Sequence, residues 1–296
     1  MDTNLMHPEQ WINECEHSFS EELKRVARAI HNQGRIKFIC LTGPTCSGKT
    51  TAANLLVRHL AEFGRCVHTI SLDDFYFDKE ILHRLSRENG RSTPDYDSVR
   101  TIDLSALRTF ISECVEEKEC HCPIFDFQKG MRTGYRTISC QGDDLFIMEG
   151  IQVLYPEILS MIEVYPSISV YIAPQSAISV GDAAFLPNEL RLLRRLVRDH
   201  RFRGTPPEQT FALWESVRDN EEKNIFPHVL RCELSIDSTM PYEIGILKPW
   251  LVQILSEIPT DSAYKEKADE ILERIRKVTP ISDRYIKSDF LYKEFL

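Results

Sequence analysis

The sequence has 296 residues, of which 42% are hydrophobic and 27% are charged, a balance typical of a soluble globular protein. Its 36 Lys and Arg residues against 45 Asp and Glu residues give a formal net charge of −9, which argues against a general nucleic-acid or anionic-membrane binder. No uninterrupted apolar run reaches the roughly 18 residues of a membrane span, and residues 1–16 lack the pattern of a secretion signal, so we expect a cytoplasmic protein.

Predicted helices and strands alternate along most of the chain. In order, the hydrophobic patterns predict a helix at 8–32, a strand at 36–41, a helix at 49–63, a strand at 66–72, a helix at 104–115, a hairpin within 121–140, strands at 145–148 and 167–172, helices at 189–202 and 205–217, a strand at 232–236, and helices at 243–257 and 262–276. Asp103 is placed to cap one helix, and Thr205 to Glu208 fit a capping box. This alternation predicts an α/β fold with a parallel sheet covered on both faces.

The cysteines do not suggest a disulfide framework, because there are nine of them at irregular spacings. Cys114, Cys120, His121 and Cys122 form a cluster that could suggest zinc. Adjacent ligands in such a run rarely all face one ion. We therefore interpret this cluster as part of a short strand before Pro123.

The strongest chemical signal is a phosphate-binding motif, GxxxxGK[ST], between a predicted strand and a predicted helix. Its glycines let successive backbone N–H groups converge on an anion, and the helix N-terminus adds its dipole. Lys49 is expected to contact the β- and γ-phosphates, and Thr50 to ligate Mg²⁺. The predicted nucleotide-binding residues here are Gly43, Pro44, Thr45, Cys46, Ser47, Gly48, Lys49, Thr50 and Thr51.

Acidic residues follow two other predicted strands. Glu149 comes directly after the strand at 145–148, where a carboxylate can hold Mg²⁺ directly or through water. Asp73 follows the strand at 66–72, where it can accept the proton of an attacking hydroxyl, and Tyr76 can line an acceptor pocket. A surface glutamate and an ordinary turn are the alternatives. The chain has no NKxD tetrapeptide, which argues against a regulatory GTPase.

Six arginines lie within residues 191–203. A nucleic-acid-binding patch and a solvated helix face are two interpretations of this run. We favour a third, a helical lid that closes on the triphosphate. Guanidinium groups stabilise the charge that builds up on the phosphoryl oxygens during transfer, and a lid excludes water that would hydrolyse the donor.

Together, these segments resemble the uridine kinase-like branch of the P-loop nucleoside kinases over most of residues 36–255. The matching segments are 43–50, 73–76, 96–103, 123–127 with Arg132, 149–150 and 191–199. Residues 214–218 and 221–227 are similar to the bacterial uridine kinase-related branch of the phosphoribulokinase/uridine kinase family.

The resemblance implies a P-loop NTPase three-layer sandwich with a five-stranded parallel sheet, a small β-hairpin subdomain at about 121–140 and an arginine-rich helical lid at about 183–206. It implies a kinase domain at 34–258. An N-terminal helical extension, 1–33, precedes this domain, and a C-terminal helix and tail, 259–296, follow it.

The resemblance also implies roles for single residues. Asp73 matches the general base that takes the proton from a ribose 5′-hydroxyl, and Lys49 and Arg194 complete the expected catalytic set. Thr50, Glu149 and Asp73 are the expected Mg²⁺ residues. Arg195 and Arg198 are expected to bind the nucleotide. The expected substrate-binding residues are Asp73, Tyr76, Asp97, Arg100, Phe125, Arg132 and Arg191.

Three positions depart from the pattern of uridine-cytidine kinases. Phe125 and Gly130 stand where the hairpin of those enzymes presents a tyrosine and a histidine to the pyrimidine, and Arg100 replaces a ribose-binding aspartate. Asp97 or Asp95 can take over the ribose contact. These changes remove polar groups that discriminate between substrates, so they leave the acceptor open.

The sequence therefore predicts a kinase that uses ATP and Mg²⁺ to phosphorylate the 5′-hydroxyl of a nucleoside, with uridine or cytidine the leading acceptor. One alternative acceptor is another sugar, a sugar phosphate or a small alcohol, and a cationic Arg100 would favour an anionic one. A second alternative is a non-catalytic nucleotide-binding regulatory protein. The resemblance implies a homo-oligomer. No nucleic-acid or membrane partner is expected.

Overall fold

A computed structural model of the chain describes residues 7–88, 96–287, 290 and 295. Its helices are α1 (Pro8–Asn32), α2 (Lys49–Glu62), α3 (Lys79–Glu88), α4 (Leu104–Glu116), α5 (Pro156–Ile162), α6 (Pro187–Arg203), α7 (Pro207–Asn224), α8 (Phe226–Val229), α9 (Glu243–Ser256) and α10 (Lys265–Arg276). Its strands are β1 (Phe38–Thr42), β2 (Val67–Ser71), β3 (Glu119–Asp126), β4 (Met131–Ser139), β5 (Leu145–Glu149), β6 (Ser167–Ala173), β7 (Ile178–Val180), β8 (Ala183–Phe185) and β9 (Leu234–Asp237).

The central feature is a five-stranded sheet in the order β2-β5-β1-β6-β9, and every pair of neighbouring strands is parallel. The strands adjacent in this order are separated in sequence by helices, as parallel pairing requires. The predicted α/β fold with a five-stranded parallel sheet is confirmed.

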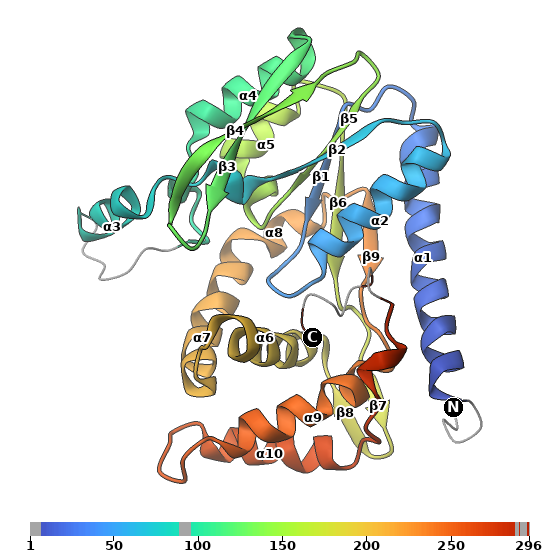
Figure 1. The fold of residues 1–296 in the computed structure, drawn as a ribbon, viewed down its shortest axis with the longest axis vertical. Helices are drawn as coiled ribbons and strands as arrows, with labels where there is room; N and C mark the ends of the chain where they lie inside the picture. Colours follow the sequence, from blue (N-terminus) through green and yellow to red (C-terminus); the bar gives the residue numbers. More distant parts are fainter. Residues whose placement is uncertain (1–6, 89–95, 288–289, 291–294, 296) are drawn as a thin grey trace.

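The two faces of the sheet carry two hydrophobic cores, because successive side chains of a strand point to opposite faces. In β1, Phe38 and Cys40 pack with the core formed by α4 and α5, whereas Ile39 and Leu41 pack with the core that includes α1 and α2. Helices therefore cover both faces in a three-layer arrangement. Figure 1 shows α4 and the β3–β4 hairpin at one end of the molecule and α9 with α10 at the other.

Helix α1 belongs to the larger of these cores. Its side chains Ile12, Phe19, Leu23 and Ile30 recur at helical spacing and are buried, and α1 packs along α2. At the other end of the chain, α10 packs on α9. The division of the chain at residues 33 and 258 stays a prediction.

Several local features differ from the expectations. The capping box predicted at Thr205 is wrong: α7 begins at Pro207, its N-cap is Pro206, and no side chain caps it. Helices α3, α5 and α8 and the short β7–β8 hairpin were not predicted, because each of these elements is too short for a hydrophobic period to identify it. No helix in the described residues is long and apolar enough to cross a membrane.

Candidate active site

The carboxyl ends of β1, β2 and β5 open onto one cavity of about 1250 Å³. In the parallel register, Glu149 at the end of β5 lies beside Leu41 of β1 and Ser71 of β2, so the segments that follow these strands meet. The predicted site residues that line this cavity are Thr45, Cys46, Lys49, Thr50, Asp73, Tyr76, Asp97, Phe125, Glu149, Arg195 and Arg198. Those outside its described lining are Gly43, Pro44, Ser47, Gly48, Thr51, Arg100, Arg132, Arg191 and Arg194.

The phosphate loop turns tightly between β1 and α2. Cys46 and Gly48 have φ angles of 57° and 87°, in the left-handed region. Gly43 tolerates no side chain, because a Cβ there would lie 2.1 Å from the carbonyl oxygen of Ile172. α2 begins at Lys49 with no side-chain cap among the described residues, so amides of its first turn remain available to a ligand.

The polar groups of this loop fit an anion. The Lys49 Nζ donates to the carbonyl oxygens of Gly43 at 2.9 Å and Pro44 at 3.2 Å, which holds a positive charge inside the turn. The buried Ser47 hydroxyl has no hydrogen-bond partner within the described part of the chain. A cationic amine, an unpaired hydroxyl and uncapped helix amides in one turn are the groups that bind phosphate. The loop therefore fits the triphosphate of a nucleotide.

Two of the predicted site arginines lie beneath the phosphate loop, which corrects the expectation that they face the ligand. Arg194 is fully buried, pairs with Glu243 at 2.7 Å and donates to the carbonyl oxygen of Cys46 at 3.2 Å. Arg191 is also buried, pairs with Glu221 at 2.6 Å and reaches the carbonyl oxygen of Thr45 at 3.5 Å. Both guanidinium groups therefore stabilise the phosphate loop by donating to its backbone carbonyl oxygens.

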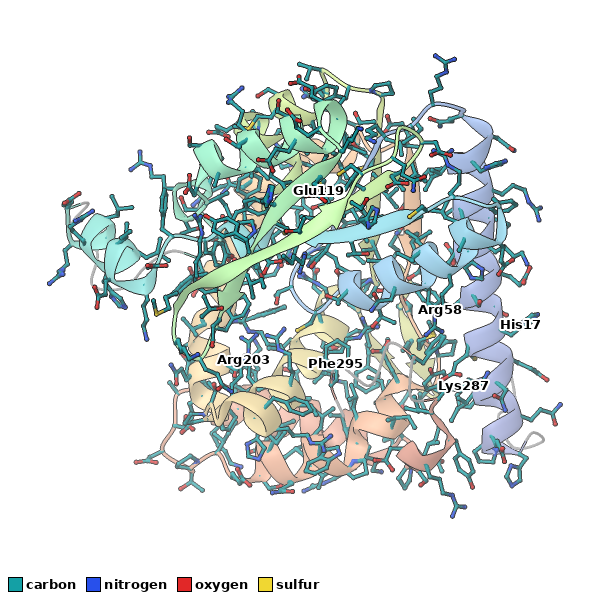
Figure 2. All side chains as sticks on the ribbon, turned by 45° about the horizontal axis from the view of Figure 1, so that its top comes forward. His17, Arg58, Glu119, Arg203, Lys287 and Phe295 are labelled. Carbon is teal, nitrogen blue, oxygen red and sulfur yellow. The ribbon has the colours of Figure 1, made fainter. Side chains whose placement is uncertain are left out.

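The arginines that line the cavity are Arg195, Arg198 and Arg203, and the last of these lies at the end of α6 (Figure 2). All three form ion pairs with the buried carboxylate of Asp199, at 3.1, 2.8 and 3.6 Å respectively. The rest of α6 packs against α7 and α9. The predicted lid segment is therefore mostly a core helix, with one cationic face turned to the cavity.

Replacing Asp199 with asparagine tests whether this carboxylate positions the three arginines. The variant keeps the shape of the side chain but removes the charge that holds them together. We expect phosphoryl transfer to fall by about 10²-fold, the cost of a small misplacement of groups at the reacting centre. Steady-state release of ADP measures the effect, with Asp269→Asn on α10 as the matched control. Full activity in a folded Asp199→Asn variant would show that the arginines need no such partner.

Asp73 and Asp74 are neighbours in sequence but serve different parts of the structure. Asp73 lines the cavity. Asp74 accepts from the amide of Phe125 at 3.3 Å and pairs with Arg136 at 3.2 Å, so it anchors the β3–β4 hairpin. Of this pair, only Asp73 is placed to meet an acceptor hydroxyl.

The pH dependence of the reaction tests the role of Asp73. Burial raises its pKa above the ordinary value of 3.8, and the Tyr76 hydroxyl and the Lys49 charge offset part of that rise. A general base has to be ionised, so we expect kcat/KM for the nucleotide, which reports the enzyme before ATP and Mg²⁺ bind, to fall on acidification at a higher pH than an ordinary aspartate would give. A pH–rate profile of the wild type measures this acid limb. A limb at the ordinary aspartate value would contradict the assignment.

Aromatic rings form the part of the cavity nearest the hairpin. Tyr76 makes edge contacts with Phe125, with ring centroids 5.8 Å apart, and with Phe127 at 6.5 Å, and the Tyr96 ring centroid lies 6.2 Å from that of Tyr76. Phe127 is 64% exposed, which is unusual for a ring of this size. The group offers flat apolar surfaces to a planar ligand.

Polar residues complete the same end of the cavity. Asp97 and Lys79 line it, and the amide of Lys79 donates to the carbonyl oxygen of Gly130 at 2.7 Å. Arg132 instead pairs with Asp103 at 3.1 Å and donates to the carbonyl oxygen of Phe75 at 3.0 Å, so it ties the hairpin to the sheet. This placement corrects the expectation that Arg132 contacts the substrate.

Arg100 is also not where it was expected. Its side chain is exposed, and Arg100 is not among the described residues that line the cavity. Asp95, the other residue suggested for the ribose contact, lies outside the described residues. Lys79 was missed because it belongs to no recognised motif. Phe127 lies in the matching segment 123–127 but was given no role there, and Arg203 and Asp199 lay within the arginine-rich run.

Oxygen-bearing side chains next to the phosphate loop fit a magnesium ion. Thr50, Asp73 and Glu149 line one cavity, and hydroxyl and carboxylate oxygens are the ligands that Mg²⁺ prefers. Glu149 is buried at the end of β5, where pairing with β1 and β2 fixes the backbone that carries its carboxylate. These three residues would hold the ion.

The model of the phosphoribulokinase/uridine kinase family matches residues 38–244, which include the phosphate loop, Asp73, Glu149 and the arginine-rich helix. The chain belongs to this family. The match covers all five strands of the central sheet.

Two curated relatives carry uridine kinase names. Uridine-cytidine kinase C of Dictyostelium discoideum is 26% identical over 238 residues, covering 78% of this chain and 46% of that protein. Uridine kinase of Ureaplasma urealyticum is 25% identical over 179 residues, covering 60% of this chain and 76% of that protein. The chain thus spans about half the length of the Dictyostelium relative.

A solved structure shares the fold. A proposed fructose transport system kinase of Silicibacter sp. TM1040 has a TM-score of 0.50 and 16% identity, covering 72% of this chain and 98% of that protein. At this identity the likeness concerns the fold alone.

Proposed function

We propose that this family member is an ATP-dependent kinase that transfers the γ-phosphoryl group to the 5′-hydroxyl of a nucleoside, with uridine or cytidine the leading acceptor. The observation that carries the proposal is the position of Asp73 in one cavity between the phosphate loop and a group of aromatic rings. Such a cavity can hold a triphosphate and a planar acceptor with a carboxylate between them.

The chemistry assigned to this chain is a proton transfer coupled to an in-line displacement. Asp73 takes the proton of the acceptor hydroxyl while the hydroxyl oxygen forms a bond to the γ-phosphorus. At the same time the bond between the γ-phosphorus and the oxygen that bridges it to the β-phosphate breaks, which releases ADP. Lys49 and the cavity arginines stabilise the charge on the transferred group. When bound, Mg²⁺ supplies further neutralisation of the phosphate oxygens.

The aromatic group supports a nucleoside acceptor. A pyrimidine is planar, and Phe125, Phe127 and Tyr76 offer ring surfaces at its expected position. Asp97 in the same lining can accept hydrogen bonds from ribose hydroxyls. The names of the Dictyostelium and Ureaplasma relatives, uridine-cytidine kinase C and uridine kinase, agree with this class of acceptor.

A second acceptor class is supported by Lys79. This lysine lines the acceptor end of the cavity and can bind a phosphate or carboxylate of a small alcohol or sugar phosphate. In this alternative, Lys79 supplies the positive charge that the sequence analysis expected from Arg100.

A panel of acceptors separates these functions. With ATP and Mg²⁺ present, the release of ADP is measured for uridine, cytidine, purine nucleosides, sugar phosphates and small hydroxy acids. The proposal predicts the largest stimulation by a pyrimidine nucleoside and a 5′-monophosphate as product. Stimulation by anionic alcohols alone would favour the second class. ATP binding with no stimulation by any acceptor would point to a non-catalytic nucleotide-binding regulatory protein.

A further inference from the structure

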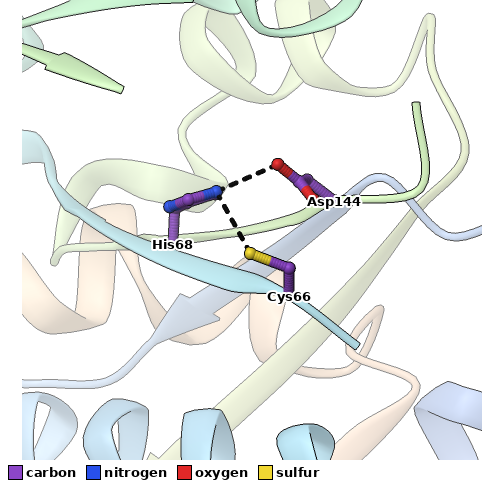
Figure 3. Close-up of side chains that lie close together, drawn as sticks. All are labelled: Cys66, His68 and Asp144. Carbon is purple, nitrogen blue, oxygen red and sulfur yellow. Dashed lines mark hydrogen bonds and ion pairs between the residues drawn. The ribbon is translucent and has the colours of Figure 1, made fainter. Parts of the chain in front are cut away.

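Three side chains with metal-ligating atoms converge at the edge of the sheet opposite the phosphate loop (Figure 3). Cys66 precedes β2, His68 lies within β2, and Asp144 directly precedes β5. The register pairs Val67 with Leu145, so the starts of the two strands lie side by side. The phosphate cavity lies at the carboxyl ends of β2 and β5, whereas this cluster lies at their amino ends, so the two sites are separate.

The three ligand atoms surround one point. The His68 Nε2 lies 3.1 Å from the Asp144 Oδ2 and 3.7 Å from the Cys66 Sγ, and all three atoms lie within 4.8 Å of one another. Tetrahedral zinc, with bonds of about 2.3 Å to sulfur and about 2.0–2.2 Å to nitrogen and oxygen, sets its ligand atoms about 3.3–3.6 Å apart. The two separations from His68 Nε2, 3.1 and 3.7 Å, lie close to those edges.

The alternative chemistry of a cysteine, a histidine and an aspartate is a nucleophilic triad, and the geometry argues against it. A triad uses both ring nitrogens, one for the nucleophile and one for the carboxylate. Here one nitrogen, Nε2, faces both the thiol and the carboxylate. With both partners on one nitrogen, the ring cannot take a proton from the thiol on one side while the carboxylate orients it from the other, whereas a cation between the three atoms can accept a lone pair from each.

The surroundings hold the ligands in place. Asp144 is buried, and its Oδ2 also accepts from the amide of Gln141 at 2.9 Å. The His68 ring packs on Phe146 with centroids 5.2 Å apart. Outer-sphere contacts of this kind orient metal ligands and strengthen binding. Cys66 is exposed, so solvent can reach the cluster.

We propose that Cys66, His68 and Asp144 bind one zinc ion, with a fourth position open to water or a small ligand. The mixed sulfur, nitrogen and oxygen donors suit zinc better than Mg²⁺ or Ca²⁺, which take oxygen ligands. The bound ion links the starts of β2 and β5. A ligand that binds only the folded state stabilises the protein against unfolding, so zinc raises the Tm of the protein.

Titration with Co²⁺ and Zn²⁺ under a non-chelating reductant tests the site. We expect one equivalent of Co²⁺ to produce a thiolate-to-cobalt charge-transfer band, which Zn²⁺ then displaces. Cys66→Ser abolishes the band, and each of Cys66→Ser and His68→Ala lowers zinc affinity by at least about 100-fold, more than outer-sphere changes typically do. Because Cys66 is exposed, Cys66→Ser is not expected to disturb folding.

Two matched variants separate this site from other metal-binding groups. Cys232→Ser removes a half-buried cysteine elsewhere, and Asp73→Asn removes a carboxylate of the phosphate cavity. Both are expected to keep the cobalt band and the zinc-dependent rise in Tm. Absence of any equivalent of bound zinc in the wild type, or an unchanged cobalt band in Cys66→Ser, would overturn the proposal.

Discussion

Replacing Asp73 with asparagine is expected to lower the rate of phosphoryl transfer by about 10²- to 10⁴-fold, the usual contribution of a positioned general base. The amide keeps the size of the side chain but cannot take the proton of the acceptor hydroxyl. Binding of ATP is expected to persist, because Lys49 and the amides of the loop are unchanged. Single-turnover transfer and calorimetric ATP binding measure the two effects separately.

Although Asp73→Asn is expected to lower activity, it is not expected to lower the stability of the folded protein. Burial raises the pKa of Asp73 in the folded protein above its unfolded value, so the ionised carboxylate disfavours folding at neutral pH. Removing the charge therefore leaves the free energy of unfolding at pH 7 equal to or above that of the wild type. Loss of activity together with a large loss of stability would indicate a structural role for Asp73.

Asp74→Asn is the natural comparison for Asp73→Asn. It removes the ion pair with Arg136 and weakens the bond to the amide of Phe125, both of which hold the hairpin. We expect a higher KM for the acceptor with a much smaller loss of kcat. Equal losses of kcat in the two variants would contradict the assignment of the base to Asp73.

Replacing Arg194 with methionine is expected to lower the free energy of unfolding by about 3–5 kcal/mol, the typical cost of breaking a buried ion pair from one side. Arg194 and Glu243 are each 0% exposed, and two of the guanidinium nitrogens bond to the carboxylate at 2.7 and 3.0 Å. Without the guanidinium, Glu243 is left as a buried charge. Urea denaturation measures the loss.

A double variant distinguishes this structural role from a catalytic one. Arg194→Met with Glu243→Leu removes both charges, and apolar replacement of a whole buried pair is often neutral or stabilising. We expect the double variant to recover most of the lost stability. Strong loss of transfer in an Arg194→Met protein with wild-type stability would show instead that Arg194 acts on the phosphoryl group.

The sequence was sufficient for the fold and for the phosphate loop because both rest on local signals. Apolar runs mark β1, β5 and β6, and the glycines at 43 and 48 mark a turn that only such residues fit. The Asp103 cap was also predicted correctly, since its oxygen accepts from the amide of Ala106 at 3.0 Å. Each of these features depends on residues close together in the chain.

The orientation of the arginines on α6 could not be predicted from the sequence. Arg191 and Arg194 share the buried face of α6 with Leu190 and Leu193, which is unexpected because burying a charge is costly. Their partners Glu221 and Glu243 lie 30 and 49 residues further along the chain. Only the packing of α7 and α9 on α6 brings these carboxylates to the arginines.

The residues at the acceptor end of the cavity could not be predicted from sequence motifs either. Lys79 enters the cavity beside Gly130 of the hairpin, and this contact depends on how the hairpin folds over α3. Likewise, the ring of Phe127 joins Tyr76 only through the turn between β3 and β4. These contacts join segments that are distant in sequence.

The most direct test of the central claim is a crystal structure with a non-hydrolysable ATP analogue and uridine. We expect the terminal phosphate to lie on the loop around Lys49, and the 5′-oxygen of uridine to lie within about 2.6–3.2 Å of an Asp73 carboxylate oxygen, the reach of a general base. Uridine bound outside this cavity, or Asp73 turned away from both the 5′-oxygen and the terminal phosphate, would contradict it.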